Sequence, residues 1–239
     1  MTQRTLIIGG ATGIGFAVAQ LLATRGDHII LAGRHHDKLE RACQQLQATG
    51  TTAESVILDI TDEAQIDSLG QSLEPVDNIV VTAGSQAPGG AFTSLDLSAA
   101  KQAFDAKFWG SLAIARHLAG KIKPGGTLTL TSGFLARRTV PGTLVKTTMN
   151  AALEAAVKML AKELSPLRVN AISPGLTDTE AYSGMLPEAR QQMLVRAAEN
   201  LPARRYGRAE DLAKGYRFVI ENPFVTGSVV DIEGGALVN

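Results

Sequence analysis

The chain has 239 residues, of which 45% are apolar and 19% charged, and its 23 basic side chains match its 23 acidic ones. This composition is typical of a globular protein with enough apolar material for a large core. The balanced charge argues against nucleic acid or an anionic membrane surface as a partner. No run reaches about 18 uninterrupted apolar residues, so no membrane-spanning helix is expected.

The use of cysteine indicates a reducing compartment. Cys43 is the single cysteine, so no disulfide can form within the chain. The start of the sequence shows no long apolar core followed by a signal cleavage site. We therefore expect a cytoplasmic protein, in which Cys43 is a small buried helix residue rather than a reactive thiol.

Short apolar runs alternate with longer amphipathic stretches along the chain. The runs predict seven strands: Thr5–Ile8, His28–Ala32, Ala53–Leu58, Asn78–Thr82, Thr127–Thr131, Arg168–Ile172 and Val229–Ile232. The amphipathic stretches predict helices: Ile14–Arg25, Lys38–Ala48, Glu63–Leu73, Ser98–Leu118, Thr147–Leu164, Pro187–Asn200 and Ala209–Ile220. This alternation predicts a parallel sheet with right-handed crossovers. Since no repeat or linker interrupts it, we expect one doubly wound α/β domain over residues 1–239, a seven-stranded Rossmann sheet flanked by helices.

A glycine-rich turn follows the first predicted strand and opens the first predicted helix. It reads Gly9-Gly10-Ala11-Thr12-Gly13-Ile14-Gly15. Glycines allow positive φ and let the backbone approach a pyrophosphate, while the helix N-terminus supplies free N–H groups. The expected cofactor contacts here are Gly9, Ala11, Thr12, Gly13, Ile14 and Gly15. The alternative is a tight turn that binds no ligand.

The end of the second strand indicates which dinucleotide is bound. It reads Gly33-Arg34-His35, where an acidic residue would hold the ribose hydroxyls of NAD. A guanidinium at Arg34 suits a 2′-phosphate, and His35 is placed to assist, so we expect NADP(H) rather than NAD(H). The alternative is that Arg34 is a solvated loop residue. Since the histidines lack further ligands nearby, no metal is expected.

Taken together, these segments resemble the short-chain dehydrogenase/reductase family over nearly the whole chain. The resemblance rests on Gly9-x-x-x-Gly13-x-Gly15, Leu58-Asp59-Ile60-Thr61-Asp62, Val81-Thr82-Ala83-Gly84 and Pro174-Gly175-Leu176-Thr177-Asp178-Thr179. It implies that Asp59 contacts the adenine and that the last segment lies along the nicotinamide. The further cofactor contacts it implies are Ile60, Ala83, Gly84, Pro174, Gly175, Leu176, Thr177 and Thr179.

The expected active site departs from the family pattern of Ser, Tyr-x-x-x-Lys and an earlier Asn. Ser132 ends the fifth strand, as the family's serine does. The stretch Asn150-Ala151-Ala152-Leu153 resembles the family's Lys-Ala-Ala-Leu, which puts Asn150 at the lysine position and Lys146 at the tyrosine position. Lys107 takes the place of the family's Asn on the earlier helix. The asparagine and the lysine are therefore exchanged between two helices.

Two functions fit this altered centre. In the first, the protein remains an oxidoreductase for a small carbonyl or alcohol substrate. Lys146 then donates the proton, because burial and a nearby cation would lower the lysine pKa from about 10.4. Ser132 binds the substrate oxygen, and Asn150 or Lys107 holds the nicotinamide ribose. In the second, the protein binds NADP(H) as an inactive sensor or structural subunit. A lyase or isomerase without net redox change is a third option.

The family resemblance also implies assembly into a homo-oligomer, either a dimer or a homotetramer. The long helices Ser98–Leu118 and Thr147–Leu164 would pair with their copies. The stretch Asp178–Arg205 is the expected substrate lid. Its Tyr182 and Met185 indicate a mixed, fairly apolar pocket for a small-molecule substrate.

Overall fold

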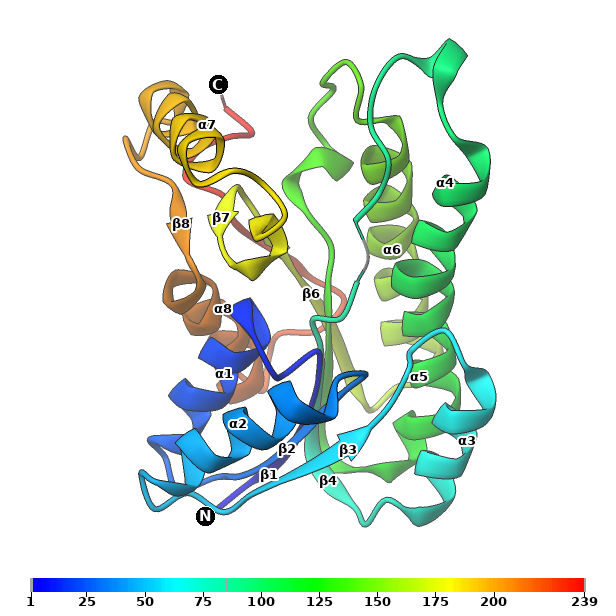
Figure 1. Ribbon diagram of the computed structural model, residues 1–239. Helices are drawn as coiled ribbons and strands as arrows, with labels where there is room; N and C mark the ends of the chain where they lie inside the picture. The colour runs from blue at the N-terminus through cyan, green and yellow to red at the C-terminus, as the bar shows by residue number, and fades with distance from the viewer. Residues whose placement is uncertain (1, 85, 239) are drawn as a thin grey trace.

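The computed structural model describes residues 2–84 and 86–238. Seven parallel strands form one sheet in the order β3-β2-β1-β4-β5-β6-β9, which confirms the predicted doubly wound arrangement (Figure 1). The strands are β1 (Arg4–Ile8), β2 (His28–Gly33), β3 (Ala53–Ile57), β4 (Val76–Val81), β5 (Ile122–Thr131), β6 (Arg168–Pro174) and β9 (Val229–Ile232). The order reverses between β1 and β4, and ligands of such sheets bind beyond the strand ends at that point.

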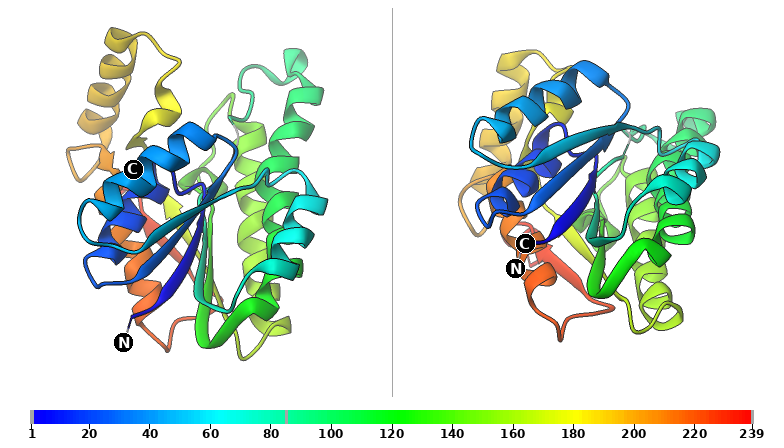
Figure 2. Two further views of the ribbon diagram at one scale, coloured as in Figure 1. Left: turned by 60° about the horizontal axis from the view of Figure 1, so that its bottom comes forward. Right: turned by 90° about the horizontal axis from the view of Figure 1, so that it is seen from below.

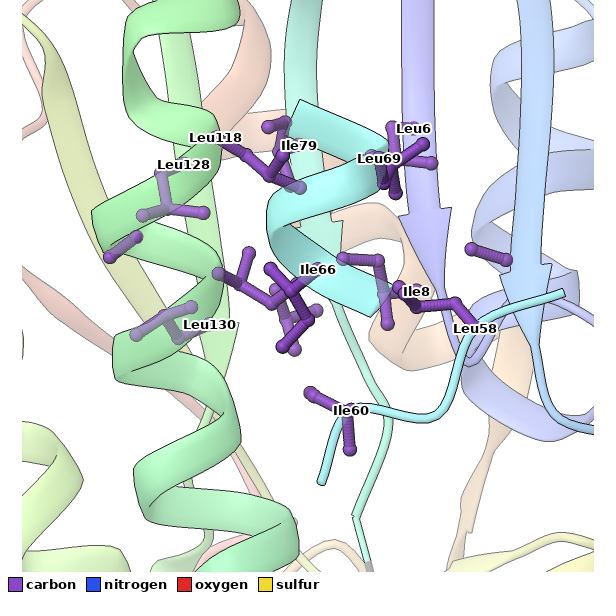
Figure 3. Packing of buried hydrophobic residues seen from close by; sticks show 14 of the residues in the cluster. Leu6, Ile8, Leu58, Ile60, Ile66, Leu69, Ile79, Leu118, Leu128 and Leu130 are labelled. Carbon is purple, nitrogen blue, oxygen red and sulfur yellow. The ribbon is translucent and has the colours of Figure 1, made fainter. Parts of the chain in front are cut away.

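Alternating strand residues supply the two apolar layers. Leu6 and Ile8 of β1 face one side of the sheet, and Ile7 faces the other. The Ile7 side is covered by α1 (Gly13–Ala23), α2 (His36–Gln47) and α8 (Ala209–Glu221). The opposite side is covered by α3 (Glu63–Ser72), α5 (Gly110–Leu118) and α6 (Leu144–Glu163). Figure 2 shows these helices on both sides of the sheet, and Figure 3 shows the packing between the sheet and α3 and α5.

The helix predicted at Ser98–Leu118 is not one regular α-helix. The chain forms α4 (Leu97–Phe104), a π-helical turn η2 (Asp105–Trp109) and then α5. A Cβ on Gly110 would lie 2.6 Å from the Ile60 carbonyl oxygen, so the bare backbone of α5 packs directly on the loop after β3. A π turn inserts a residue into a helix and is found most often at functional sites. Lys107 lies in this turn.

A smaller layer stands above the carboxyl ends of the strands. Its elements are β7 (Thr177–Asp178), the 3₁₀ turn η5 (Glu180–Tyr182), α7 (Pro187–Asn200) and β8 (Gly207–Arg208). Strands β7 and β8 form a separate two-stranded sheet that the sequence analysis did not predict. The remaining 3₁₀ turns are η1 (Phe92–Ser94), η3 (Ala119–Lys121) and η4 (Phe134–Ala136). None of the helices within the described ranges has the length and apolar character needed to cross a membrane.

A buried arginine holds the end of α8 against the sheet. Arg168 begins β6 and is 8% exposed. Its Nη1 donates to the carbonyls of Val219 at 2.6 Å, Asn222 at 3.0 Å and Val225 at 3.2 Å, and its Nη2 donates to Ile220 at 3.0 Å. One guanidinium thus binds carbonyl groups of the last turn of α8 and of the segment that follows it, and its burial lowers its pKa.

We expect Arg168→Met to lower the free energy of unfolding by about 2–4 kcal/mol, because several buried carbonyls lose a charged donor. Urea denaturation followed by circular dichroism measures the change. The matched control is Arg217→Met on α8, which removes only an exposed ion pair with Glu221 and should cost less than about 1 kcal/mol. Equal losses in the two variants would contradict the assigned role of Arg168.

Candidate functional site

The glycine-rich turn lies directly against the end of β4. The Thr82 hydroxyl donates to the carbonyls of Ile8 and Gly9, each at 3.2 Å, and Ala83 N donates to Ile8 at 3.0 Å. A Cβ on Gly9, whose φ is +86°, would lie 2.6 Å from Ala83 N, and a Cβ on Gly15 would lie 2.3 Å from the Gly9 carbonyl oxygen. Only glycine fits at these two positions, and the backbone there is left bare.

A cavity of about 400 Å³ opens beside this turn at the carboxyl ends of β1, β2 and β4. The Thr12 side chain at the N-cap of α1 makes no hydrogen bond to the helix, so it does not cap the first N–H groups of α1. Many of the residues predicted to bind the cofactor line this cavity: Gly9, Ala11, Thr12, Gly13, Ile14, Gly15, Arg34, His35, Asp59, Ile60, Ala83, Gly84 and Thr179. Its shape and bare backbone fit a dinucleotide.

One end of the cavity is basic. Arg34, His35 and Lys38 lie there after β2, opposite Asp59 and Thr61 after β3. Thr61 donates to Asp59 Oδ1 from its backbone at 2.9 Å and from its hydroxyl at 2.8 Å. These bonds and the positive charge of Arg34 lower the pKa of Asp59. The sequence analysis did not predict Lys38 or Thr61 at this cavity. The basic residues around Arg34 were a signal from which Lys38 could have been predicted.

The segment that starts at the last residue of β6 divides into two parts. Pro174, Gly175, Leu176 and Thr177 do not line the cavity. A Cβ on Gly175 would lie 2.5 Å from Glu233 Cα, so this part packs against the segment after β9. The next residues do reach the cavity, since Thr179 is joined there by Glu180, Ala181 and Ser183, which the sequence analysis missed.

Lys107 lies where the ends of β4 and β5 meet. Its Nζ donates to the Ser132 carbonyl oxygen at 2.8 Å, and its Cδ would lie 3.8 Å from a Cβ on Gly84. The side chain is half-buried, and its neighbour Ala106 lines the cavity together with Gly84. Burial, followed by repulsion from Lys146 and opposed by attraction to Glu154, lowers the pKa of Lys107 to about 8.

The two predicted site residues of α6 differ sharply in their environments. Lys146 is exposed, so the burial that the sequence analysis expected for it is wrong. Asn150 is buried and lies against the backbone after β5, since a Cβ on Gly133 would be 2.8 Å from Asn150 Nδ2. Within residues 2–84 and 86–238, Asn150 Oδ1 is buried without a hydrogen-bond partner. An acceptor left free in this way is suited to a ligand hydroxyl.

Ser132 belongs to a buried charged network that the sequence analysis missed. Its hydroxyl donates to Glu154 Oε1 at 2.9 Å, and Glu154 is only 9% exposed. Arg137 Nε lies 3.1 Å from Glu154 Oε2, and Arg137 Nη1 donates to Asp231 at 2.7 Å. The Ser132 hydroxyl proton is therefore directed to Glu154, and this network joins α6 to the segment after β5 and to β9 itself.

Comparison with known proteins agrees with this geometry. A family model described as enoyl-(acyl carrier protein) reductase matches residues 9–236. A short-chain dehydrogenase/reductase of Stachybotrys chlorohalonatus is 33% identical over 253 residues, which cover 98% of this chain and 96% of that protein. The chain belongs to the short-chain dehydrogenase/reductase family. The predicted family resemblance is thereby confirmed.

Solved structures of other short-chain dehydrogenase/reductase proteins share the fold. A small-chain dehydrogenase in complex with NADPH is 40% identical, with a TM-score of 0.85 and full coverage of both chains. The MalC reductase/Diels-Alderase from Malbranchea aurantiaca is 28% identical, with a TM-score of 0.92, and covers 100% of this chain and 97% of that one. These relatives are named as dehydrogenases and reductases, so the chain belongs to a family of oxidoreductases.

The tyrosines of this short-chain dehydrogenase/reductase protein lie away from Lys107 and Ser132 in sequence: they are Tyr182, Tyr206 and Tyr216. Tyr216 is fully buried under the sheet and lies 2.6 Å from the Thr131 hydroxyl. Its burial raises its pKa. Burial also raises the pKa of Tyr182, which belongs to η5 above the cavity. Neither change favours proton donation near neutral pH.

We expect Glu154→Gln to lower the free energy of unfolding by about 1–3 kcal/mol, because Arg137 loses a buried anionic partner. Thermal and urea denaturation measure the loss. Glu163→Gln, on the exposed side of the same helix α6, is the control and should change stability by less than about 0.5 kcal/mol. If both variants unfold at the wild-type midpoint, the network around Glu154 contributes nothing to the fold.

Proposed function

We propose that this protein is an NADP(H)-dependent oxidoreductase for a small carbonyl or alcohol substrate, with an atypical catalytic centre. The observation that carries the proposal is the cavity at the reversal point of the sheet. The same cavity is lined by the glycine turn at the start of α1 and by the cluster of Arg34, His35 and Lys38. Such a turn suits a pyrophosphate, and the basic cluster suits the extra phosphate of NADP(H).

The selection of NADP(H) over NAD(H) rests on the residues after β2. Gly33 and Arg34 stand where an acid would bind the ribose hydroxyls, and Lys38 adds a second cation to the same end of the cavity. The 40% identical dehydrogenase solved in complex with NADPH supports the same choice. We therefore keep Arg34 as the proposed ligand of the 2′-phosphate and add Lys38 to it.

The remaining site residues can be given roles toward such a cofactor and its substrate. NADPH, when bound, supplies the hydride for carbonyl reduction. Asn150 would offer its free Oδ1 to a hydroxyl of the nicotinamide ribose. The Ser132 hydroxyl, which donates to Glu154, can accept a hydrogen bond but has no second proton to give. Lys107 supplies the positive charge that stabilises a developing alkoxide, and Lys146 adds to the positive potential around Lys107.

A second candidate function is a binding protein that holds NADP(H) without turnover. It is favoured by one observation: the proton of the Ser132 hydroxyl is directed to Glu154 and not toward a substrate. The two functions differ in whether NADPH is consumed with any member of a panel of aldehydes, ketones, quinones and imines. Protection against unfolding by NADPH without its oxidation would favour the binding protein.

We also propose that the protein assembles through the helices predicted to pair with their copies. Trp109 in η2 is 58% exposed, and Met159 on α6 is 55% exposed. Large apolar side chains in such positions favour a contact with another copy.

The cysteine content supports a reducing compartment such as the cytoplasm, because the single cysteine, Cys43, is a buried free thiol.

Arg34→Ala should weaken the binding of NADPH by about 10- to 100-fold, because a charge-assisted contact to phosphate is worth about 1.5–3 kcal/mol. The binding of NADH, which lacks that phosphate, should stay within about threefold. Isothermal titration calorimetry measures both. Arg41→Ala, an exposed arginine of α2, is the matched control. Unchanged NADPH affinity in Arg34→Ala would remove the basis for the cofactor assignment.

Trp109→Arg should convert the assembled protein to a smaller species, because a charge would be buried at the contact between copies. Sedimentation velocity compares it with the wild type at matched concentrations. Lys101→Arg, which keeps an exposed cation on α4, serves as the control. A wild-type protein that sediments as a monomer would refute the proposed assembly.

A further inference from the structure

The family resemblance puts Lys146 at the position of the family's proton donor, and in the structure Lys146 acts electrostatically on a second lysine, Lys107. Their environments are different. Lys146 is exposed on α6, whereas the Lys107 amine is held at 2.8 Å by the Ser132 carbonyl between the ends of β4 and β5. The wall beside Lys107 is formed by Gly84 and Ala106, which line the cavity. Of these two lysines, Lys107 is therefore the one that packs beside residues lining the space proposed for the cofactor.

The hydrogen bonding of Lys107 leaves it able to donate. An ammonium group has three N–H donors, and the Ser132 carbonyl takes one of them. No ion pair within 4 Å involves Lys107 among the residues that the structure describes. Two donors thus remain for a ligand, while the bond to Ser132 fixes where the amine lies. A fixed amine that packs beside the cavity-lining Gly84 is suited to act as a general acid.

The charged groups that face Lys107 come from α6. Lys146 repels it, and Glu154 attracts it. The attraction from Glu154 is reduced because its carboxylate is shared with Arg137 at 3.1 Å and the Ser132 hydroxyl at 2.9 Å. From β4 and β5 the nearest groups are the backbone at Gly84 and Ser132. Burial and the repulsion from Lys146 therefore outweigh the attraction from Glu154, and together they lower the pKa of Lys107 to about 8.

We propose that Lys107 donates the proton to the substrate's carbonyl oxygen, while Lys146 acts only through Lys107 as a neighbouring charge. The inference rests on the proposed function as a reductase. In the reduction, the carbonyl carbon accepts a hydride from NADPH and the carbonyl π pair moves to oxygen. The new O–H bond forms as an Nζ–H bond of Lys107 breaks. The products are an alcohol, NADP⁺ and a neutral Lys107 amine, which solvent protonates again.

The first test measures Lys107 directly, without cofactor or substrate. Protein labelled with ¹³C at the lysine ε carbon is titrated by NMR, and the Lys107 signal is identified by its loss in Lys107→Gln. We expect a midpoint near pH 8. It should rise in Lys146→Gln, which removes a repelling charge, and fall in Glu154→Gln, which removes an attracting one. Glu163→Gln, on the exposed side of α6, should leave it unchanged.

The second test separates proton donation from charge. Lys107→Arg keeps a cation that can bind the Ser132 carbonyl but cannot release its proton, since its pKa exceeds 12. We expect both Lys107→Arg and Lys107→Gln to lower kcat for carbonyl reduction by about 10²- to 10⁴-fold, with the Kd for NADPH changed less than about threefold. The wild-type kcat should decline as the pH rises through 8, because the donor is then deprotonated.

The outcomes distinguish the inference from the function on which it rests. A Lys107 midpoint at the ordinary lysine value of about 10.4 overturns the inference, and so does a Lys107→Arg variant with wild-type kcat. In both cases the binding and oxidation of NADPH by the wild type would stand. A wild type that binds no NADPH, or never oxidises it, instead overturns the proposed function, whatever the midpoint of Lys107.

Discussion

At the ends of β1 and β4, Thr82 and Ala83 bind the backbone of Ile8 and Gly9 so closely that a Cβ on Gly9 would lie 2.6 Å from Ala83 N. This contact joins the two strands where the order of the sheet reverses. It keeps the glycine turn bare and fixes the start of α1 above the strand ends. The cavity beside the turn stays open because the glycines at this crossing carry no side chains that would project into it.

The same parallel arrangement brings the chemical groups together from distant segments. Strands β4 and β5 end side by side, so the Lys107 side chain lies against the backbone at both Gly84 and Ser132. The π turn carries Lys107, and the neighbouring helix α6, on the same side of the sheet, contributes Asn150 and Glu154. The cofactor cavity and the charged centre therefore share one edge of the sheet, as a hydride-transfer site requires.

The sequence predicts the parts of this protein that depend on local signals. The glycine turn and Arg34 follow strands directly, so their place at the strand ends could be predicted. We expected Lys146 to be buried, and this was wrong. Its exposure depends on how the segment between β5 and α6 packs, and the periodicity of the sequence does not encode that packing. Glu154 was missed for a related reason, since a glutamate on a helix is usually solvated. The π turn around Lys107 is likewise set by tertiary contacts, such as that between Gly110 and Ile60.

Lys107 and Asn150 both converge on the backbone of residues 132 and 133, one through the Ser132 carbonyl and the other against Gly133. This shared contact couples the two positions. A lysine introduced at position 150 while Lys107 is present would bring a second positive charge to the same stretch of backbone, and like charges oppose each other. The residue that this fold tolerates at position 150 therefore depends on the charge at position 107.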